Sequence, residues 1–438
     1  MIKNTYFILI VTGFPIYLFT KCIYPQAYVE KKTRHRFGEM HLGFDYRSSL
    51  GGSTRFLDTQ GQIQELGLEP SGEPRFIIGG THFWGHADFY VAIPFLFNQY
   101  KKANQTILHT PNVETGFKFY PWRIEHGKIR PFLGVVWTPF LYEQDNGNLS
   151  FGDGPNLNHT SFPLIGGLTY RNRQHFFNLG ISWNYSNAQD YYISRTEQVE
   201  INTPPFQVSL SYGFLFDTTI RAEKEWESGE TQRKTLKLAE RGGLNDFYLS
   251  TGFSSAFWLG NSTYNQEKRP YLTKFTASIA LEFGLGYHFH KWDMNLSLNY
   301  RGMSSSNSAY GAEQDIRRRA YGLEVTKNFW DYNGFVPFFG AIVSSENLRF
   351  REDFENQDTF DVSQNRTSLG FTFGWDIRPN RIQTWLIRSN LRLYPRLMLN
   401  VDGQRSISFS NLEANFVQLV IYPERIFSKK LRRIDETK

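Results

Sequence analysis

Residues 274–300 read KFTASIALEFGLGYHFHKWDMNLSLNY, and this stretch decides the fold. Every odd position from Phe275 to Phe289 is apolar, whereas the even positions are mostly polar or glycine. After the short turn at His290-Lys291, the apolar residues move to even positions, from Trp292 to Tyr300. A period of two is typical of a strand with one apolar face. A change of parity across a tight antiparallel turn keeps the apolar side chains on one face, so the stretch predicts a β-hairpin.

The same alternation recurs along most of the chain and predicts an all-β protein with about 16 strands. The candidate strands cover roughly residues 37–47, 74–84, 86–97, 111–121, 129–141, 161–171, 174–186, 205–220, 244–258, 272–289, 291–302, 318–330, 335–349, 365–377, 382–398 and 405–422.

The connections between these candidate strands alternate between short and long. Short ones fall near Gly85, at 123–127, 172–173, 290–291, 331–334 and 379–380, and longer ones at 48–73, 98–110, 142–160, 187–204, 259–271, 303–317 and 350–364. Short periplasmic turns and long outer loops are typical of a transmembrane barrel. Two connections break the rule, because 400–403 is short on the outer side and 222–243 is long on the periplasmic side.

Composition narrows the class of protein. Aromatic residues make up 17% of the chain although its mean hydropathy is −0.45. The only long apolar stretch, Tyr6 to Phe19, is shorter than the roughly 20 residues of a membrane-spanning helix, which excludes a multi-span helical transporter. Charged residues amount to 21%, which argues against disorder, and the net charge of +6 is too small to favour nucleic-acid binding.

The first 27 residues have the pattern of a Sec signal peptide. Lys3 precedes the apolar run, and cleavage is expected after Ala27. The single cysteine, Cys22, excludes an internal disulfide and a thiolate metal site. An acylated lipoprotein cysteine is the alternative for Cys22, but the preceding Phe19-Thr20-Lys21 lacks the small residues that such a site needs.

A soluble β-sandwich or propeller is the main alternative fold, and its apolar faces would be mostly Val, Ile and Leu. Here aromatic residues stand at strand ends next to the short turns, as an interfacial girdle requires. The candidate girdle residues are Tyr120, Trp122, Tyr287, Phe289, Trp292, Phe329 and Trp330.

With this signal peptide, aromatic alternating strands and hairpins such as Gly116–Pro121 through Ile129–Gly134, the chain resembles the outer-membrane β-barrel proteins of Gram-negative bacteria. The resemblance is architectural, covers nearly all of the mature chain and names no single porin-like family. It implies insertion by the barrel-assembly machinery, which usually recognises a last strand that ends in an aromatic residue. Asn415 to Tyr422 is the candidate, although 16 residues follow it.

These observations predict three segments. Residues 1–27 form the signal peptide, residues 28–422 form a single antiparallel transmembrane barrel, and residues 423–438 form a basic periplasmic tail. We expect the protein in the cell outer membrane, in contact with lipid and lipopolysaccharide.

Charged residues in the last hairpin form the candidate site. If the odd residues of 382–398 face lipid, then Arg388, Asn390 and Arg392 face the lumen, opposite Asn411 and Glu413. A turn that pairs Met398 with Arg405 would place Asn411 beside Arg392 and Glu413 beside Asn390. Two readings stay open: an arginine ladder along an anion path, or a charge network that stiffens the wall or anchors a plug. Lys118, Lys274 and Glu114 or Glu282 are further candidate lumen charges.

No enzyme activity or cofactor is expected. The chain has neither a G-x-S-x-G elbow nor an H-E-x-x-H zinc pattern, and His288 and His290 lie at the periplasmic end. Acidic loop segments 145–153 and 352–358 offer oxygen ligands for Ca²⁺ without EF-hand spacing. The run Arg317-Arg318-Arg319 suits either lipopolysaccharide phosphates or simple solubility.

The sequence therefore favours a porin or solute channel, with about 16 strands enclosing more space than side chains fill. The alternative is a non-conducting barrel that serves as a scaffold or subunit of an outer-membrane assembly. The basic tail and the long 222–243 connection favour this alternative, because they offer a surface to a periplasmic protein partner.

Overall fold

The computed structural model describes residues 38–427 apart from 59, 69, 96–98, 103–104, 112, 146–152, 217–229, 333, 355–358 and 379–383. The expected signal peptide and residues 428–438 of the expected tail lie outside the described residues. The described chain is almost entirely antiparallel β-structure. No helix in these ranges is long and apolar enough to cross a bilayer.

The second half of the chain forms a closed ring of eight strands. In ring order they are β16 (Asp246–Trp258), β17 (Thr276–Phe289), β18 (Met294–Ala309), β19 (Ala312–Asn328), β20 (Phe335–Phe354), β21 (Phe360–Ile377), β22 (Trp385–Tyr394) and β25 (Asn411–Ile421), which pairs back to β16.

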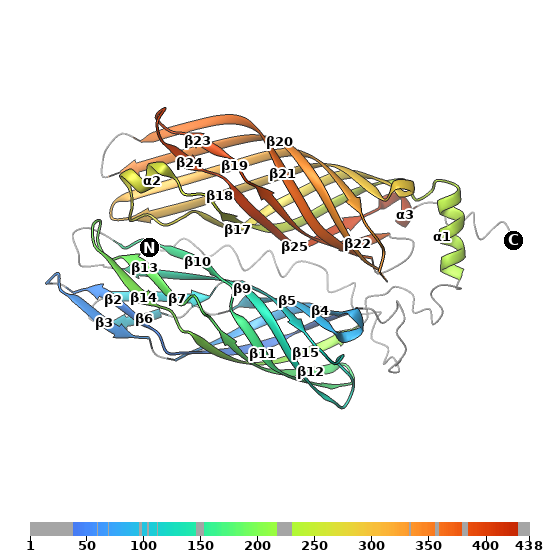
Figure 1. Ribbon diagram of the computed structural model, residues 1–438, viewed down its shortest axis with the longest axis horizontal. Helices are drawn as coiled ribbons and strands as arrows, with labels where there is room; N and C mark the ends of the chain where they lie inside the picture. The colour runs from blue at the N-terminus through green and yellow to red at the C-terminus, as the bar shows by residue number, and fades with distance from the viewer. Residues whose placement is uncertain are drawn as a thin grey trace.

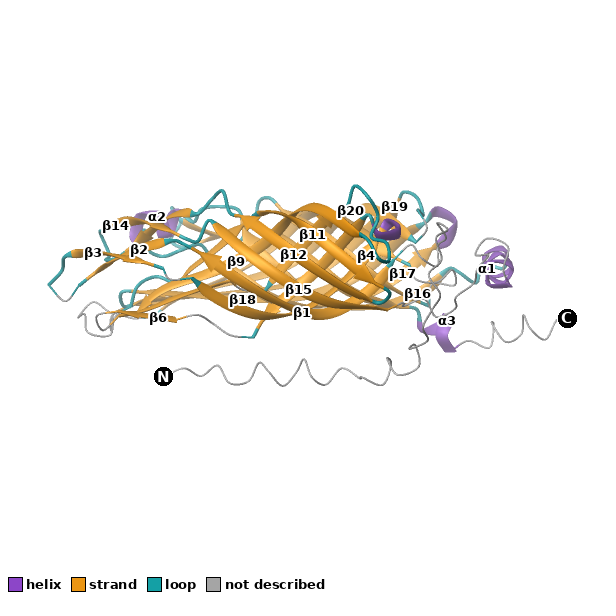
Figure 2. Cartoon of the chain, turned by 90° about the horizontal axis from the view of Figure 1, so that it is seen from below, coloured by secondary structure: helices purple, strands orange, loops and turns teal. Residues whose placement is uncertain are grey.

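The first half forms a ring of its own. In pairing order its strands are β1 (Glu39–Leu50), β4 (Ser71–His82), β5 (Ala87–Pro94), β8 (Glu114–Phe119), β9 (Ile129–Asp145), β11 (Leu164–Asn172), β12 (His175–Trp183) and β15 (Phe206–Phe216). The pairing of β15 with β1 closes the circle. The two rings lie side by side with their long axes aligned (Figure 1), and Figure 2 shows how strongly the strands are tilted.

The expected single barrel of about 16 strands is therefore wrong in how it closes. Each expected strand overlaps a strand of one ring, but β15 pairs with β1 instead of continuing to β16. Period-two alternation specifies which face of a strand is apolar and does not specify the pairing partner. Along the chain, helix α1 (Glu230–Glu240) falls between the two rings, inside the 222–243 connection that broke the short-turn rule, and it lies beyond the end of the second ring in Figure 1.

Several expected outer loops are extensions of strands. Strands β18 and β19 continue to a tight turn at Tyr310-Gly311, where both residues have positive φ, so the expected loop 303–317 is wrong. The 48–73 connection holds the hairpin of β2 (Ser53–Leu57) and β3 (Ile63–Gly67), which joins β13 (Ala188–Tyr192) and β14 (Gln198–Asn202) in a small sheet.

The remaining elements are short. They are β6 (Gln99–Lys102), β7 (Gln105–Pro111), β10 (Leu157–Ser161), β23 (Met398–Asn400), β24 (Ser406–Ser408), α2 (Thr263–Lys268), α3 (Pro423–Phe427) and the 3₁₀ turns η4 (Phe83–Gly85) and η5 (His290–Trp292).

Most buried charged residues lie inside the rings, beside apolar clusters such as that of Trp258, Phe275 and Phe350, and large apolar side chains cover the outside. On β17, Leu281, Phe283 and Leu285 are about half exposed, whereas Glu282 between them is fully buried. A soluble β-protein has the opposite arrangement, with its apolar face in the core. Since an apolar outer band around a polar interior is what a bilayer requires, the burial pattern fits a membrane-spanning barrel.

The rings contact each other near both ends. We call the end of the rings with the longer connections the loop end, and the end with the short turns the turn end. At the loop end, the Tyr310 hydroxyl donates to the Tyr192 carbonyl at 2.8 Å. At the turn end, the Phe83 ring lies 5.0 Å from the Phe335 ring, and the Trp84 ring lies 5.7 Å from the Tyr332 ring. The two rings are thus in contact as well as joined along the chain.

Candidate functional site inside the second ring

The predicted inward residues of β22 are all buried in the second ring. Arg388, Asn390 and Arg392 are each no more than 3% exposed, and Asn411 and Glu413 of β25 no more than 1%. The interior they enter is narrow, because an eight-stranded barrel has about the width that side chains fill.

Glu413 lies at the centre of this interior. Its two carboxylate oxygens accept hydrogen bonds from Arg318 Nη1 at 2.6 Å and from Arg301 Nη1 at 2.7 Å. Strand β25, which carries Glu413, and strand β19, which carries Arg318, are four steps apart in either direction around the ring. Arg318 and Glu413 therefore reach each other from opposite walls.

Arg318 is held at its other edge by a second carboxylate. Its Nε and Nη2 donate to the two oxygens of Glu346 at 2.8 Å each, which is the bidentate geometry that a guanidinium group favours. The Arg318 guanidinium also lies 4.4 Å from the centre of the Tyr394 ring. One side chain thus joins β19, β20, β22 and β25.

The two arginines predicted from the sequence have partners as well. Arg392 pairs with Glu282 on β17 and, at 2.9 Å, with Glu324 on β19. Arg388 pairs with Asp376 on the neighbouring β21 at 2.7 Å. The guanidinium groups of Arg388 and Arg392 are thus both matched by carboxylates.

The expected register of the last hairpin is wrong by two residues. In the strand register of the structure, Arg392 lies opposite Glu413, Asn390 opposite Asn415 and Tyr394 opposite Asn411. The connection is longer than expected, because β23 and β24 pair Met398 with Ser408 instead of Arg405. Turn geometry sets the register of a hairpin, and the longer turn shifts every pair.

A bulge in β25 also changes which residues face inward. Strand β16 pairs Phe253 with Val417 and Ser254 with Asn415, so one residue of β25 is extra. Beyond this bulge the parity is reversed, and Val420 and Tyr422, which continued alternation from the inward Asn411 and Glu413 would place on the lipid face, are buried.

The sequence reasoning missed several members of the network. Arg301, Arg318, Glu324, Glu346 and Asp376 face inward, and each is nearly fully buried. The parity of β19 would have found Arg318, because it alternates with the outward Arg317 and Arg319.

Among the other predicted lumen charges, Glu282 lies in the second ring and Lys118 and Glu114 in the first, all buried. Lys274 is exposed before β17, which contradicts its expected place in the lumen.

The first ring is filled in the same way. Arg47 pairs with Glu73 at 3.2 Å and with Glu114, and Arg75 pairs with Asp45. Nearer the short turns of the first ring, the Asp88 carboxylate accepts a hydrogen bond from His41 at 2.7 Å and lies 3.5 Å from the Lys118 ammonium.

Some polar atoms inside the second ring have no hydrogen-bond partner within the described residues. They include both amide atoms of Asn390, the hydroxyls of Thr372 and Tyr394, and Nε and Nη2 of Arg301. Buried polar groups are nearly always hydrogen-bonded, and ordered water supplies the partner where protein does not. Internal water is the usual partner of such atoms in folded proteins.

Most of the candidate girdle residues are exposed or partly exposed in the structure, but one is buried. Trp122, Trp292, Phe329 and Trp330 are between 54% and 61% exposed, and Tyr287 and Phe289 are partly exposed. Tyr120 does not fit, because it is fully buried and its hydroxyl lies 3.0 Å from Thr169 Oγ1. It continues the inward parity of Glu114 and Lys118 on β8, so its hydroxyl finds a partner inside the ring.

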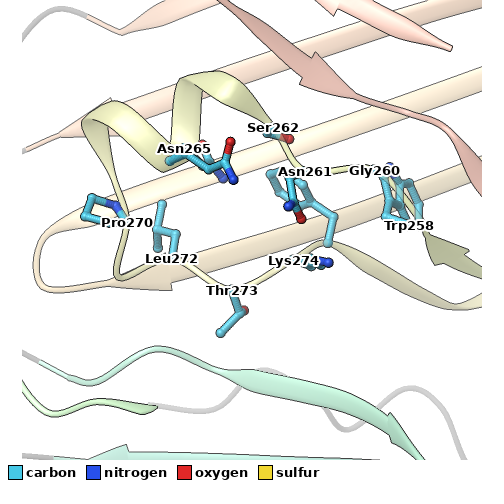
Figure 3. A pocket seen from close by; sticks show the side chains of 11 residues that line it. Trp258, Gly260, Asn261, Ser262, Asn265, Pro270, Leu272, Thr273 and Lys274 are labelled. Atoms are coloured by element: carbon cyan, nitrogen blue, oxygen red, sulfur yellow. The ribbon is translucent and has the colours of Figure 1, made fainter. Parts of the chain in front are cut away.

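A small cavity of about 170 Å³ opens beside α2 at the loop end of the second ring (Figure 3). Trp258, Asn261, Asn265 and Lys274 are among its lining residues. The Trp258 indole N–H has no hydrogen-bond partner among the described residues. None of its lining residues is an ion-pair partner of Arg301, Arg318 or Arg392.

The remaining candidates for chemistry do not gather into a site. His288 Nδ1 lies 2.9 Å from Asn295 Oδ1, and its Nε2 lies 3.9 Å from Asp293. Among the described residues, no three His, Cys, Asp or Glu side chains group as a metal ion requires. Residues 146–152 and 355–358, which hold parts of the two Ca²⁺ candidates, lie outside the described residues.

Comparison with known proteins gives matches only among solved structures. No protein-family model and no curated protein matches the chain. Neisserial surface protein A is 12% identical and covers 40% of this chain and 96% of its own, with a TM-score of 0.27. The outer membrane protein AlkL is 14% identical, with coverages of 45% and 99% and a TM-score of 0.30.

An outer membrane channel from Pseudomonas putida F1 is 8% identical and covers 90% of this chain and 99% of its own, with a TM-score of 0.20. These three neighbours are outer-membrane β-barrel proteins. At these low identities nothing about the activity of this chain follows from them.

Proposed function

We propose that this chain is a tandem β-barrel of the outer membrane whose two rings are closed to solutes, and that it acts as a membrane-embedded scaffold. One observation carries the proposal. Arg318 and Glu413 meet at 2.6 Å from opposite walls of the second ring. An ion pair that bridges the full width of the lumen interrupts any continuous water-filled pore.

The burial pattern supports the membrane part of the proposal. Large apolar side chains are exposed on the outside of both rings, for example Leu133 and Leu179 in the first and Leu298 and Val343 in the second. The exposed tryptophans Trp122, Trp292 and Trp330 lie by the short turns, at one boundary of such a band.

Single-channel conductance of the purified full-length protein in a planar bilayer tests the proposal, with insertion checked by flotation of the protein with liposomes. We expect insertion without steady conductance. Steady conductance from folded protein would overturn the closed-ring proposal. An anion-selective reversal potential that is lost when Arg388 and Arg392 are both changed to Gln would then establish the arginine path instead.

A solute channel is the second candidate, and the unpaired polar atoms inside the second ring support it. Asn390, Thr372 and Tyr394 present unpaired polar atoms inside the second ring. A row of water molecules bound to these atoms would conduct ions only after the ion pairs rearrange. A variant that removes both partners of one cross-lumen pair, Arg392→Ala with Glu282→Ala, should conduct if the pairs are the barrier and stay silent if packing closes the ring.

The scaffold role predicts a periplasmic partner, and the structure refines how to test it. Arg425 in α3 donates to Asp246 at 2.7 Å and to the Leu244 carbonyl at 2.6 Å, so the start of the expected tail packs on the second ring. A truncation should therefore begin after Phe427. Removal of residues 428–438 should abolish capture of a periplasmic protein in a pull-down while the barrel still folds.

A further inference from the structure

The outward face of β19 changes from apolar to charged residues partway along the strand. From the turn end, Val325, Leu323 and Tyr321 form part of the apolar outer band. The next two outward residues are Arg319 and Arg317, which are both exposed. Eight residues of tilted strand separate Lys327 from Arg319, a height of about 20 Å, close to that of an outer-membrane apolar band.

A third arginine lies beside these two. Strand pairing puts Arg349 of β20 directly opposite Arg317 and puts Asn347 opposite Arg319. We call Arg317, Arg319 and Arg349 the outer arginine patch. Like charges directly opposite each other in a sheet are destabilising, so this arrangement calls for an anion between them.

The patch is only partly neutralised within the described chain. Arg349 forms an ion pair with Asp361 on β21. Asp361 also attracts Arg317 electrostatically, but neither Arg317 nor Arg319 forms a hydrogen bond or a close ion pair with a described residue. The acidic outward residues Asp315 and Asp361 lie one row further from the apolar band, opposite Arg351. The rows next to the band therefore keep an excess of positive charge.

Neutral hydrogen-bonding groups and aromatic rings surround the patch. Ser304 pairs opposite Arg317, and the Asn347 amide donates to Asn365 at 2.8 Å. On the side of the apolar band lie Tyr300 and Tyr321, with ring centres 5.1 Å apart, as is common where a membrane meets water.

We infer that the outer arginine patch binds the phosphate of a phosphorylated glycolipid head group in the adjoining leaflet, an inference that rests on the proposed membrane location. Guanidinium groups form bidentate, charge-assisted hydrogen bonds with phosphate. The Asn and Ser side chains suit sugar hydroxyls, and the apolar band below takes the acyl chains. A lipid fits better than free phosphate, because the patch lies on the outer wall directly above that band.

Titration of the full-length protein with bisphosphorylated lipid A, read by native mass spectrometry, tests the inference. The variant Arg317→Gln/Arg319→Gln/Arg349→Gln should lose at least about tenfold in affinity for lipid A, because several charge-assisted bonds are lost. The matched control is Arg55→Gln on β2, an exposed arginine away from the patch, which should bind as the parent does. Replacement of the three arginines by Lys should give an intermediate loss, since the charge stays and the bidentate geometry goes.

Equal binding by parent and triple Gln variant would overturn the inference, and so would equal binding of dephosphorylated lipid A. Full competition by inorganic phosphate would assign the patch to a free anion and reject the lipid. Flotation with liposomes separates this inference from the proposed function. Protein that inserts without phosphate-dependent binding contradicts only the inference, whereas protein that does not insert contradicts both.

Discussion

Arg318 and Glu413 are 95 residues apart in the sequence and meet at 2.6 Å in the middle of the second ring, where each is about 1% exposed. Their pairing ties opposite walls together. It also places two charges where water is scarce, so each depends on the other for its stability.

Substitution of one partner should therefore be costly. Glu413→Gln leaves Arg318 and Arg301 without their shared carboxylate, and we expect the second ring to lose about 3–5 kcal/mol of unfolding free energy. Urea unfolding in detergent, read by the heat-modifiable gel shift, measures the loss. Glu313→Gln, at an exposed position on β19, is the control and should unfold with the parent. An unchanged midpoint for Glu413→Gln would show that the pair does not support the ring.

A glycine inside the second ring makes room for an aromatic side chain. A Cβ atom at Gly286 would lie 2.2 Å from Cζ of Tyr248, which is buried. We expect Gly286→Ala to destabilise the ring by about 1–3 kcal/mol through overpacking. Gly67→Ala is the control, because a Cβ there meets no atom within 4 Å. Equal unfolding midpoints for the two variants would contradict the packing.

Contact between the rings depends on a strained turn. Phe83 and Trp84 both have positive φ, 53° and 57°, and their rings lie against Phe335 and Tyr332 of the second ring. A double-mutant cycle of Trp84→Ala and Tyr332→Ala should give a coupling of about 0.5–1.5 kcal/mol, as is usual for aromatic pairs. A cycle that pairs Trp122→Ala with Tyr332→Ala should give none. Coupling absent from both cycles would mean that the turn does not hold the rings together.

The turn between β8 and β9 should be sensitive to acid. Arg123 Nε donates to Glu125 at 2.7 Å, and Arg130 and Lys128 also approach, so the pKa of Glu125 is lowered from 4.5 to about 2. A lowered pKa means that the stabilisation is complete above pH 4.5 and is lost as the pH falls towards 2. The carboxyl ¹³C shift of Glu125 should titrate in that range. Arg123→Gln should raise the midpoint, and an unmoved midpoint would exclude this pair as the cause.

Local features of the fold could be predicted from the sequence, whereas its closure could not. The alternation in 274–300 gave the hairpin of β17 and β18, with its turn at 290–293. The same alternation could not tell that β15 turns back to β1, because strand pairing between distant segments leaves no local pattern. The long 222–243 connection was the available signal of a break between two rings.

The candidate site shows the same division. Parity identified Arg388 and Arg392 as inward residues, since β22 alternates without interruption. It failed beyond the bulge of β25, where Val420 and Tyr422 turn inward. The partners of Arg392, Glu282 on β17 and Glu324 on β19, come from distant strands and follow only from the closed ring, whereas Asp376 lies opposite Arg388 on the neighbouring β21.

Each ring is sealed by its own first and last strands, β1 with β15 and β16 with β25, and none of the described strands is exchanged between them. Biogenesis can therefore be vectorial, since the amino-terminal cylinder holds every strand it needs before the other has been delivered to the membrane. Each closure joins segments more than 150 residues apart, which makes it the slow, entropically costly step of assembly. An insertion catalyst that works on this chain must consequently complete two seams for each polypeptide, and one of them closes on an internal strand.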